Sequence, residues 1–382
     1  MNAGGATSVV RDYRVVPVQP GMADGIARLQ RLHWASGFRV NLAYLRWKYF
    51  ENPYVVEPLI YVALHGDEVV GMRGIFGASW NIGEGLEAAI PCAADTLIHP
   101  AHRDQGLFER LSDLAFADLA AKGYPHVLNL SPTAANYVAS VVSMGWRSIG
   151  STAELARASD AGTARRKLVA RVPRNDTVRG MARLGRRIRS SAGSMTFGRL
   201  DAVDATTRGE VQVSSRPRPE AMATAAAAEP ASEAITQVRD ARFFSWRFDN
   251  PRAAYRFLYI GEPDLSGFMV LHNSMGRSRV NIVDWSFRSH ADASALLAVA
   301  TEGGRFGDLR IWTRSLDPQL VGLLRDAGFT TPAASSEPTR LAGKAMVRPT
   351  SDHSNPAGWV VKGRSLDSAA SWDLQMVAAD SF

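Results

Sequence analysis

The spacing of hydrophobic residues predicts a regular succession of strands and helices in the first part of the chain. Residues 13–18 alternate like a strand, and apolar residues recur at helical spacing over 21–34. A second helix is expected over 41–49, because Pro53 disfavours helical conformation in the residue before it. A hairpin is then predicted at 59–64 with 68–76, and it is followed by a strand at 88–98 and a helix at 106–121. The remaining predicted elements are a strand at 127–130, a helix at 134–143 and a strand at 146–151.

The same order of elements returns in the second half of the chain. A strand is expected over 211–215, and then two helices, a hairpin, a strand, a helix, a strand and a helix follow. The stretch WKYFENP, residues 47–53, also returns as WRFDNP, residues 246–251. Repetition of several elements in one order predicts a tandem duplication. We expect an N-terminal domain at 1–160, a basic helical connector at 161–198 and a C-terminal domain at 199–382.

Composition supports two ordinary globular domains. The 382 residues are 46% hydrophobic and 21% charged. The sequence has no apolar run long enough for a membrane span, and its first residues do not resemble a signal peptide. Cys92 is the only cysteine, which excludes an intrachain disulfide and a thiolate zinc cluster. We therefore expect a cytoplasmic protein without a metal.

The formal net charge of +7 is concentrated in the predicted connector, where ten Arg and Lys residues lie between Arg157 and Arg199. Two interpretations remain open. The segment is a solvated helix with a basic face, or it attracts a phosphorylated partner. Aromatic residues are scarce there, so a surface that stacks nucleic-acid bases is not expected.

The segment from Asp95 to Phe108 has the pattern of an anion-binding turn. A predicted strand ends at Ile98, a loop carries Arg103, and Gly106 opens a helix. Main-chain N–H groups at a helix N-terminus have no partner within the helix and attract negative charge. Glycine allows close approach of a phosphate, and arginine adds a cation. The pattern predicts a site for a phosphate or pyrophosphate.

The sequence HPAHRDQGLF, residues 99–108, resembles the pyrophosphate loop of the GNAT superfamily, the acetyl-CoA-dependent N-acyltransferases. Arg103 and Gly106 fit the family pattern, but Phe108 stands where Gly or Ala is usual. The resemblance implies an α/β (α+β) fold of two tandem GNAT-like domains, each a mixed central sheet flanked by helices. It also implies acetyl-CoA as the acyl donor. The main chain of Leu97, Ile98 and His99 would pair with the pantetheine arm, and the pyrophosphate would be held by Arg103, Asp104, Gln105, Gly106, Leu107 and Phe108. An ordinary strand–loop–helix turn is the alternative.

The second copy lacks this loop. Its equivalent stretch, residues 288–295, has neither the Arg-x-x-Gly spacing nor a glycine at the helix start, and Asp292 has the wrong charge for a phosphate site. We expect only the N-terminal copy to bind CoA, with the C-terminal copy as scaffold or as one wall of the acceptor cleft.

Three residues are candidates for proton transfer. Asp95 lies on the predicted strand before the loop, where many family members carry a base, but Asp284 occupies the matching position in the second copy and favours a structural role for both. His99 lies at the end of the strand, and simple exposure there is the alternative. The tyrosine that the family commonly has on the later helix is replaced by Val141. Tyr137, one turn earlier, is a substitute acid or a packing residue.

Three functions remain open. The first is an N-acyltransferase, in the simplest case an N-acetyltransferase, acting on a small primary amine. Similar tandem chains imply an amino sugar of surface-polysaccharide synthesis as the acceptor. The alternatives are an aminoacyl-tRNA-dependent peptidyltransferase and a non-catalytic GNAT-like pseudo-enzyme. In the repeated motif we expect Trp47 and Trp246 to pack against the sheet, and an exposed Lys48, Tyr49 or Glu51 to touch substrate.

Overall fold

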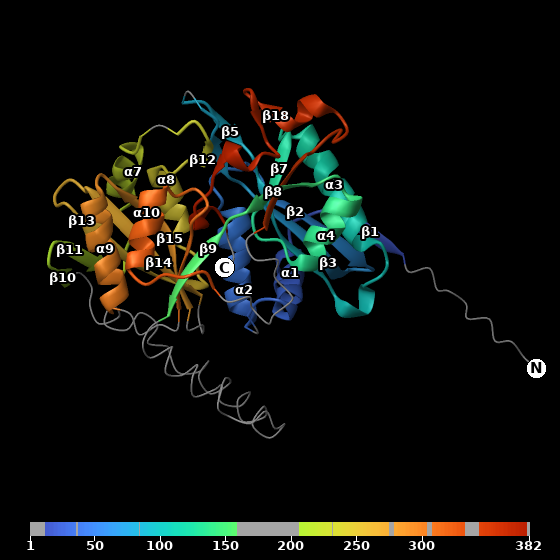
Figure 1. Ribbon diagram of the computed structural model, residues 1–382. Coiled ribbons are helices and arrows are strands. Elements are labelled where there is room, and N and C mark those ends of the chain that lie inside the picture. Colours follow the sequence, from blue (N-terminus) through green and yellow to red (C-terminus); the bar gives the residue numbers. More distant parts are fainter. Residues whose placement is uncertain are drawn as a thin grey trace, which may run out of the picture.

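The computed structural model consists of two lobes, each built on a seven-stranded sheet (Figure 1). The predicted connector lies outside the described residues, which are 12–35, 37–83, 85–158, 206–230, 232–274, 279–303, 308–332 and 344–379.

The N-terminal lobe follows the predicted order of elements. Its elements are β1 (Tyr13–Pro17), α1 (Ala23–Leu29), α2 (Phe38–Leu45), β2 (Leu59–His65), β3 (Glu68–Phe76), β4 (Ser79–Asn81), β5 (Glu87–Ala89), β6 (Cys92–Ile98), α3 (Leu107–Ala121), β7 (His126–Asn129), α4 (Ala134–Ser143) and β8 (Arg147–Ser151). Two predictions of extent are wrong. The helix expected over 41–49 begins at Phe38 and continues as a π-helix over Arg46–Phe50. The strand expected over 88–98 is divided into β5 and β6 at Ile90 and Pro91.

The sheet of this lobe has the strand order β1-β2-β3-β6-β7-β17-β8, and helices cover both faces. On one face, Ile26 and Leu29 of α1 belong to the same buried cluster as Met72 of β3. On the other face, Leu111 of α3 is buried against β1, β2 and β3, and Tyr137 of α4 joins that cluster. The apolar stripe of each helix therefore lies on the sheet, as the hydrophobic spacing predicts.

The C-terminal lobe repeats this architecture. Its elements are β10 (Thr206–Arg208), β11 (Val211–Ser214), α7 (Pro219–Ala227), β12 (Ile235–Gln237), α8 (Ala241–Arg247), β13 (Ala253–Ile260), β14 (Gly267–Ser274), β15 (Arg279–Phe287), α9 (His290–Gly303), β16 (Asp308–Trp312) and α10 (Pro318–Asp326). The sheet order is β10-β11-β13-β14-β15-β16-β9. The predicted architecture of two tandem mixed sheets flanked by helices is confirmed.

The two lobes exchange a strand. β9 (Glu154–Ala158) leaves the N-terminal lobe and pairs with β16, as Figure 1 shows. In return, β17 (Lys344–Pro349) from the end of the chain lies between β7 and β8. The predicted domain boundaries stay a prediction, but neither sheet is completed by its own half of the chain.

The repeated motif lies where the lobes meet. The rings of Trp47 and Trp246 stack 5.2 Å apart with an interplanar angle of 11°. Each indole N–H donates to the main-chain oxygen of the other tryptophan, at 2.7 and 2.8 Å. The two tryptophans therefore pair with each other, and Trp246 also packs, as expected, against a buried cluster that includes Phe257 of β13.

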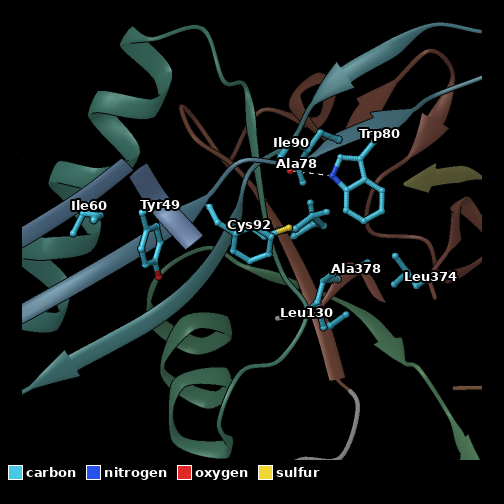
Figure 2. Close-up of a cluster of buried hydrophobic side chains, with 14 of the residues drawn as sticks. Tyr49, Ile60, Ala78, Trp80, Ile90, Cys92, Leu130, Leu374 and Ala378 are labelled. Carbon is cyan, nitrogen blue, oxygen red and sulfur yellow. Dashed lines mark hydrogen bonds between the residues drawn. The ribbon is translucent and has the colours of Figure 1, made fainter. Parts of the chain in front are cut away.

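The last described residues form a strap across both lobes. β20 (Trp372–Asp373) pairs with β12, which pairs with β4. Figure 2 shows Leu374 and Ala378 of the strap among core side chains of the N-terminal lobe, close to Cys92 of β6 and Leu130 after β7. Arg247 fastens the strap through hydrogen bonds to the main-chain oxygens of Val377 and Ala379 at 3.0 and 2.6 Å.

Candidate functional site

Strands β6 and β7 are parallel neighbours that share a single residue pair, Cys92 with Leu128. Beyond this pair, toward the carboxyl end of β6, the edge that faces β7 has no strand partner among the described residues. On the other edge, His99 donates its N–H to Val70 of β3 at 2.8 Å. Because main-chain groups alternate along a strand, the N–H and C=O of Ile98 point to the open edge.

A β-bulge divides β6 at Asp95. The register with β3 passes from Arg73 opposite Thr96 to Ile75 opposite Ala93, so Ala94 and Asp95 together oppose Gly74. The bulge turns Asp95 toward the face that α2 covers.

Asp95 is held by two side chains of the repeated motif. Lys48 Nζ lies 3.3 Å from Asp95 Oδ1, and the Tyr49 hydroxyl donates to Oδ2 at 3.0 Å. The side chains of Lys48 and Asp95 are each 1% exposed. Gly74 makes room for this arrangement, since a Cβ there would lie 2.1 Å from the Tyr49 hydroxyl oxygen.

The prediction that Lys48 or Tyr49 is exposed for substrate is therefore wrong. The π-helix at Arg46–Phe50 adds a residue to the turn, and Trp47, Lys48 and Tyr49 are all buried. Glu51 is exposed, as expected. Asp95 is accordingly a buried ion-pair partner, and its accessibility as a base is not supported by this geometry.

The matching aspartate of the C-terminal lobe is also buried and paired, but with a partner from another element. Arg239 Nη1 lies 2.8 Å from Asp284 Oδ1 and is itself paired with Glu229. Burial raises the pKa of Asp284 to about 6, against the opposing effect of Arg239. The two aspartates thus share a position in the fold but not a partner.

The loop after β6 is held by side-chain hydrogen bonds at its start, whereas the helix that follows it has no capping side chain. His99 caps the 3-10 helix Pro100–His102, and the ring of His102 is hydrogen-bonded to the Tyr13 hydroxyl at 3.0 Å. Asp104 and Gly106 have positive φ of 59° and 65°. α3 then begins at Leu107 with no side chain that caps its N-terminus.

The corresponding helix of the C-terminal lobe, α9, has a side-chain cap at its N-terminus. The Ser289 hydroxyl accepts from the main-chain N–H of Asp292 at 3.1 Å and donates to the Asp292 carboxylate at 2.9 Å. This capping arrangement satisfies the groups that α3 leaves open, and it places a negative charge at the helix start.

Side chains of the α3 loop divide into two sets. Arg103, Asp104 and Gln105 are exposed, whereas Leu107 is buried in the core. Phe108 is half-buried, and the guanidinium carbon of Arg73 lies 5.8 Å from the centre of the Phe108 ring. An anion at this turn would meet main-chain N–H groups and Arg103, while Phe108 belongs to the packing beneath the helix.

His99 and Tyr137 lie apart from Asp95. His99 lines a hollow of about 630 Å³ with Gln19, Met22, Arg28 and Glu68, formed by α1 and the β2–β3 turn. Its Nδ1 accepts from the Ala101 main-chain N–H at 3.3 Å, which leaves the neutral ring with its proton on Nε2. Tyr137 lies beneath the ammonium group of Lys344, 4.8 Å from its ring centre.

The sequence reasoning missed Arg73 and Arg348 and misplaced Lys48. Arg73 is 3% exposed on a strand that reads EVVGMRGIF. A lone cation inside an otherwise apolar strand is the signal that could have identified it. Arg348 could not have been found in this way, because its strand reaches the N-terminal lobe only through the exchange.

Comparison with known proteins agrees with this geometry. Residues 19–147 match the family model described as the acetyltransferase (GNAT) domain. A GCN5-related N-acetyltransferase from Anabaena variabilis ATCC 29413 is 13% identical with a TM-score of 0.55, over 89% of this chain and 73% of that chain. A conserved protein of unknown function from Enterococcus faecalis V583, named a probable N-acyltransferase, is 13% identical with a TM-score of 0.52, over 89% and 72% of the two chains. Eis1 from Mycobacterium abscessus is 12% identical with a TM-score of 0.50, over 89% and 74%.

These structures show that the fold is shared, and the predicted resemblance to the GNAT superfamily is confirmed. No curated protein matches the sequence significantly. Among the helices in the described ranges, none has the length and apolar character needed to cross a membrane. Within the same ranges, no group of three or more His, Cys, Asp or Glu side chains is arranged as metal ligands.

Proposed function

We propose that this protein transfers an acyl group, in the simplest case acetyl, from acyl-CoA to a primary amine of a small molecule, because residues 19–147 match the GNAT acetyltransferase family model. The observation that carries the proposal is the uncapped N-terminus of α3, which follows the open edge of β6. Acyl transfer from CoA is the general chemistry of the family. The acceptor, the acyl chain and a cytoplasmic location are part of the proposal.

The donor would bind in two places. The pyrophosphate fits the turn at Arg103–Phe108, where Gly106 adopts a left-handed conformation and the first N–H groups of α3 have no side-chain acceptor. The pantetheine arm fits the open edge of β6. Of the predicted residues Leu97, Ile98 and His99, only Ile98 directs its main-chain groups there, because His99 is hydrogen-bonded to β3 and Leu97, two residues earlier, has the same orientation.

For proton transfer, the geometry supports His99 over Asp95 and Tyr137. His99 borders a hollow, while Asp95 is paired with Lys48 and Tyr137 packs beneath Lys344. We propose that the acceptor amine enters by this hollow and that His99, at its mouth, takes the proton that the ammonium form gives up before the amine reaches the thioester further along β6. An amino sugar is the first acceptor class to test.

Calorimetric titration of the full chain with acetyl-CoA tests the donor site. Gly106→Glu is expected to abolish binding, because a side chain strains the positive φ and a carboxylate repels the phosphates. His290→Glu is the matched control, since it places the same charge in the first turn of α9 and should leave the affinity unchanged.

The outcomes separate the functional hypotheses. Absence of acetyl-CoA binding by the wild type, or equal binding by Gly106→Glu, would show that the donor site is wrong. Binding without thiol release across an amine panel favours the pseudo-enzyme, and stabilisation by aminoacyl-tRNA alone favours the peptidyltransferase. If transfer occurs, His99→Gln is expected to lower kcat about 10²-fold.

A further inference from the structure

Two arginines meet beneath α3, and among the described residues neither forms a salt bridge. Arg73 of β3 is 3% exposed, donates to the Thr96 hydroxyl at 3.3 Å, and lies 5.3 Å from the ring centre of Phe116. Arg348 of β17 lies 4.0 Å from the centre of the same ring. Because β3 and β17 flank the β6–β7 pair, the two guanidinium groups reach over it from opposite sides.

The positive charges of Arg73 and Arg348 have few neutralising partners. Within the described residues, Arg73 makes no ion pair, and the Nε atoms of both arginines are buried without a hydrogen-bond partner. Arg348 Nη2 lies 3.5 Å from Nδ1 of His353. The carboxylate of Asp113 on α3 also interacts electrostatically with Arg348. Burial and the neighbouring Arg348 lower the pKa of Arg73 to about 10, so the group remains charged near neutral pH.

A buried guanidinium without a counter-ion is unfavourable, and a ligand that supplies a negative charge would offset this cost. Arginine presents a planar fork of donors that fits a carboxylate. The chemistry of the pair is therefore that of a carboxylate subsite.

The position of the pair indicates which carboxylate arrives there. If the pyrophosphate is held at the carboxyl end of β6, the pantetheine arm runs back along β6 toward Cys92, and the acyl group reaches the deepest point. Arg73 stands opposite Thr96, next to the bulge, and Arg348 stands opposite Val127, beside the single pair of β6 with β7. The arginines thus lie where the acyl chain would end.

We propose that Arg73 and Arg348 bind a substrate carboxylate beneath α3, so that the preferred donor is the CoA thioester of a dicarboxylic acid, such as succinyl-CoA. This deepens the proposed function and rests on it for the placement of the donor. A free carboxylic acid offers the same chemistry, and the experiment distinguishes the two sources.

The test compares the dissociation constants of succinyl-CoA and acetyl-CoA on the full chain. The wild type is expected to bind succinyl-CoA at least tenfold more tightly, which is about 1.4 kcal/mol. Arg73→Met should reduce this preference to below about threefold by weakening succinyl-CoA binding more than acetyl-CoA binding, whereas Arg73→Lys, which keeps the charge but not the fork, should retain part of the preference.

Two further variants keep the result interpretable. Arg348→Gln should lower the preference in the same direction, and it replaces Arg73→Met if that variant does not fold. Arg325→Met removes an exposed arginine of α10 and should change neither affinity. In parallel, the shift in melting temperature with free succinate is compared with that for succinamide, its uncharged analogue.

Each outcome decides the proposal. No preference in the wild type, or a preference that survives both Arg73→Met and Arg348→Gln, overturns the subsite even if acetyl-CoA binds as proposed. If no CoA thioester binds but succinate stabilises the wild type more than succinamide, and Arg73→Met removes the difference, the subsite stands with a free acid as ligand and the proposed function fails.

Discussion

The buried ion pair of Lys48 and Asp95 allows a test of whether Asp95 has a structural role. At an effective dielectric constant of about 20, two unit charges 3.3 Å apart attract each other by about 5 kcal/mol. Desolvation of both groups offsets most of this gain. Removal of one partner, however, leaves the other charge buried and alone. Lys48→Met is therefore expected to lower the free energy of unfolding by about 3–5 kcal/mol.

The double variant distinguishes an ion pair from two independent groups. In Lys48→Met with Asp95→Asn, no charge remains, and the loss should be at least about 2 kcal/mol smaller than the sum of the two single losses. Urea unfolding followed by tryptophan fluorescence measures all four proteins, with the midpoint and the slope reported separately.

Two results would refute this reasoning. One is a loss below about 1 kcal/mol for Lys48→Met, which would mean that the carboxylate is satisfied without it. The other is an Asp95→Asn variant that keeps full stability but loses acyl transfer, which would make Asp95 the base after all. If the structural interpretation holds, any loss of activity in Asp95→Asn should follow its loss of folded protein.

Three further outcomes follow from the structure. Asp104→Asn keeps a residue type that tolerates the φ of 59° and removes a carboxylate from the loop, so acetyl-CoA should bind about two- to fivefold more tightly by calorimetry, with stability unchanged. A double-mutant cycle between Trp47→Ala and Trp246→Ala should show a coupling of at least about 1 kcal/mol, since the rings stack and exchange two hydrogen bonds; additive losses would contradict this. Because the pKa of Asp284 is raised to about 6, the folded state holds a proton between about pH 4 and 6 that the unfolded state has released. The contribution of this group to the free energy of unfolding therefore falls as pH rises through that window. Asp284→Asn should weaken the dependence of the free energy of unfolding on pH there.

Local patterns in the sequence were sufficient for the order of elements and for the glycine at the uncapped start of α3. Gly106 marks the left-handed residue at the start of α3, and the absence of Ser, Thr, Asp or Asn at that position leaves the helix uncapped. The Ser289 and Asp292 pair marks the closed helix of the second copy in the same way. Such signals can be read from sequence because they act between residues only a few positions apart.

Side-chain environments at the site could not be read in the same way. WKYFENP predicts a helix end, and nothing within the motif shows that Lys48 turns inward, because its counter-ion is 47 positions away on a bulged strand. Arg73 and Arg348 are 275 positions apart in the sequence and meet only under α3. Burial and ion pairing depend on which strands become neighbours, and that is decided across the whole chain.

The sequence by itself determined that the chain is duplicated, that each copy is a mixed sheet with flanking helices, and that the helix after β6 starts at a glycine without a capping side chain. The tertiary structure alone decided that β9 and β17 change lobes, that Trp47 and Trp246 pair with each other, and that Arg73 and Arg348 meet under α3. The physical reason is that periodicity and capping are local, whereas strand partners are chosen by long-range pairing, and any strand edge of suitable pattern can accept a strand from either half.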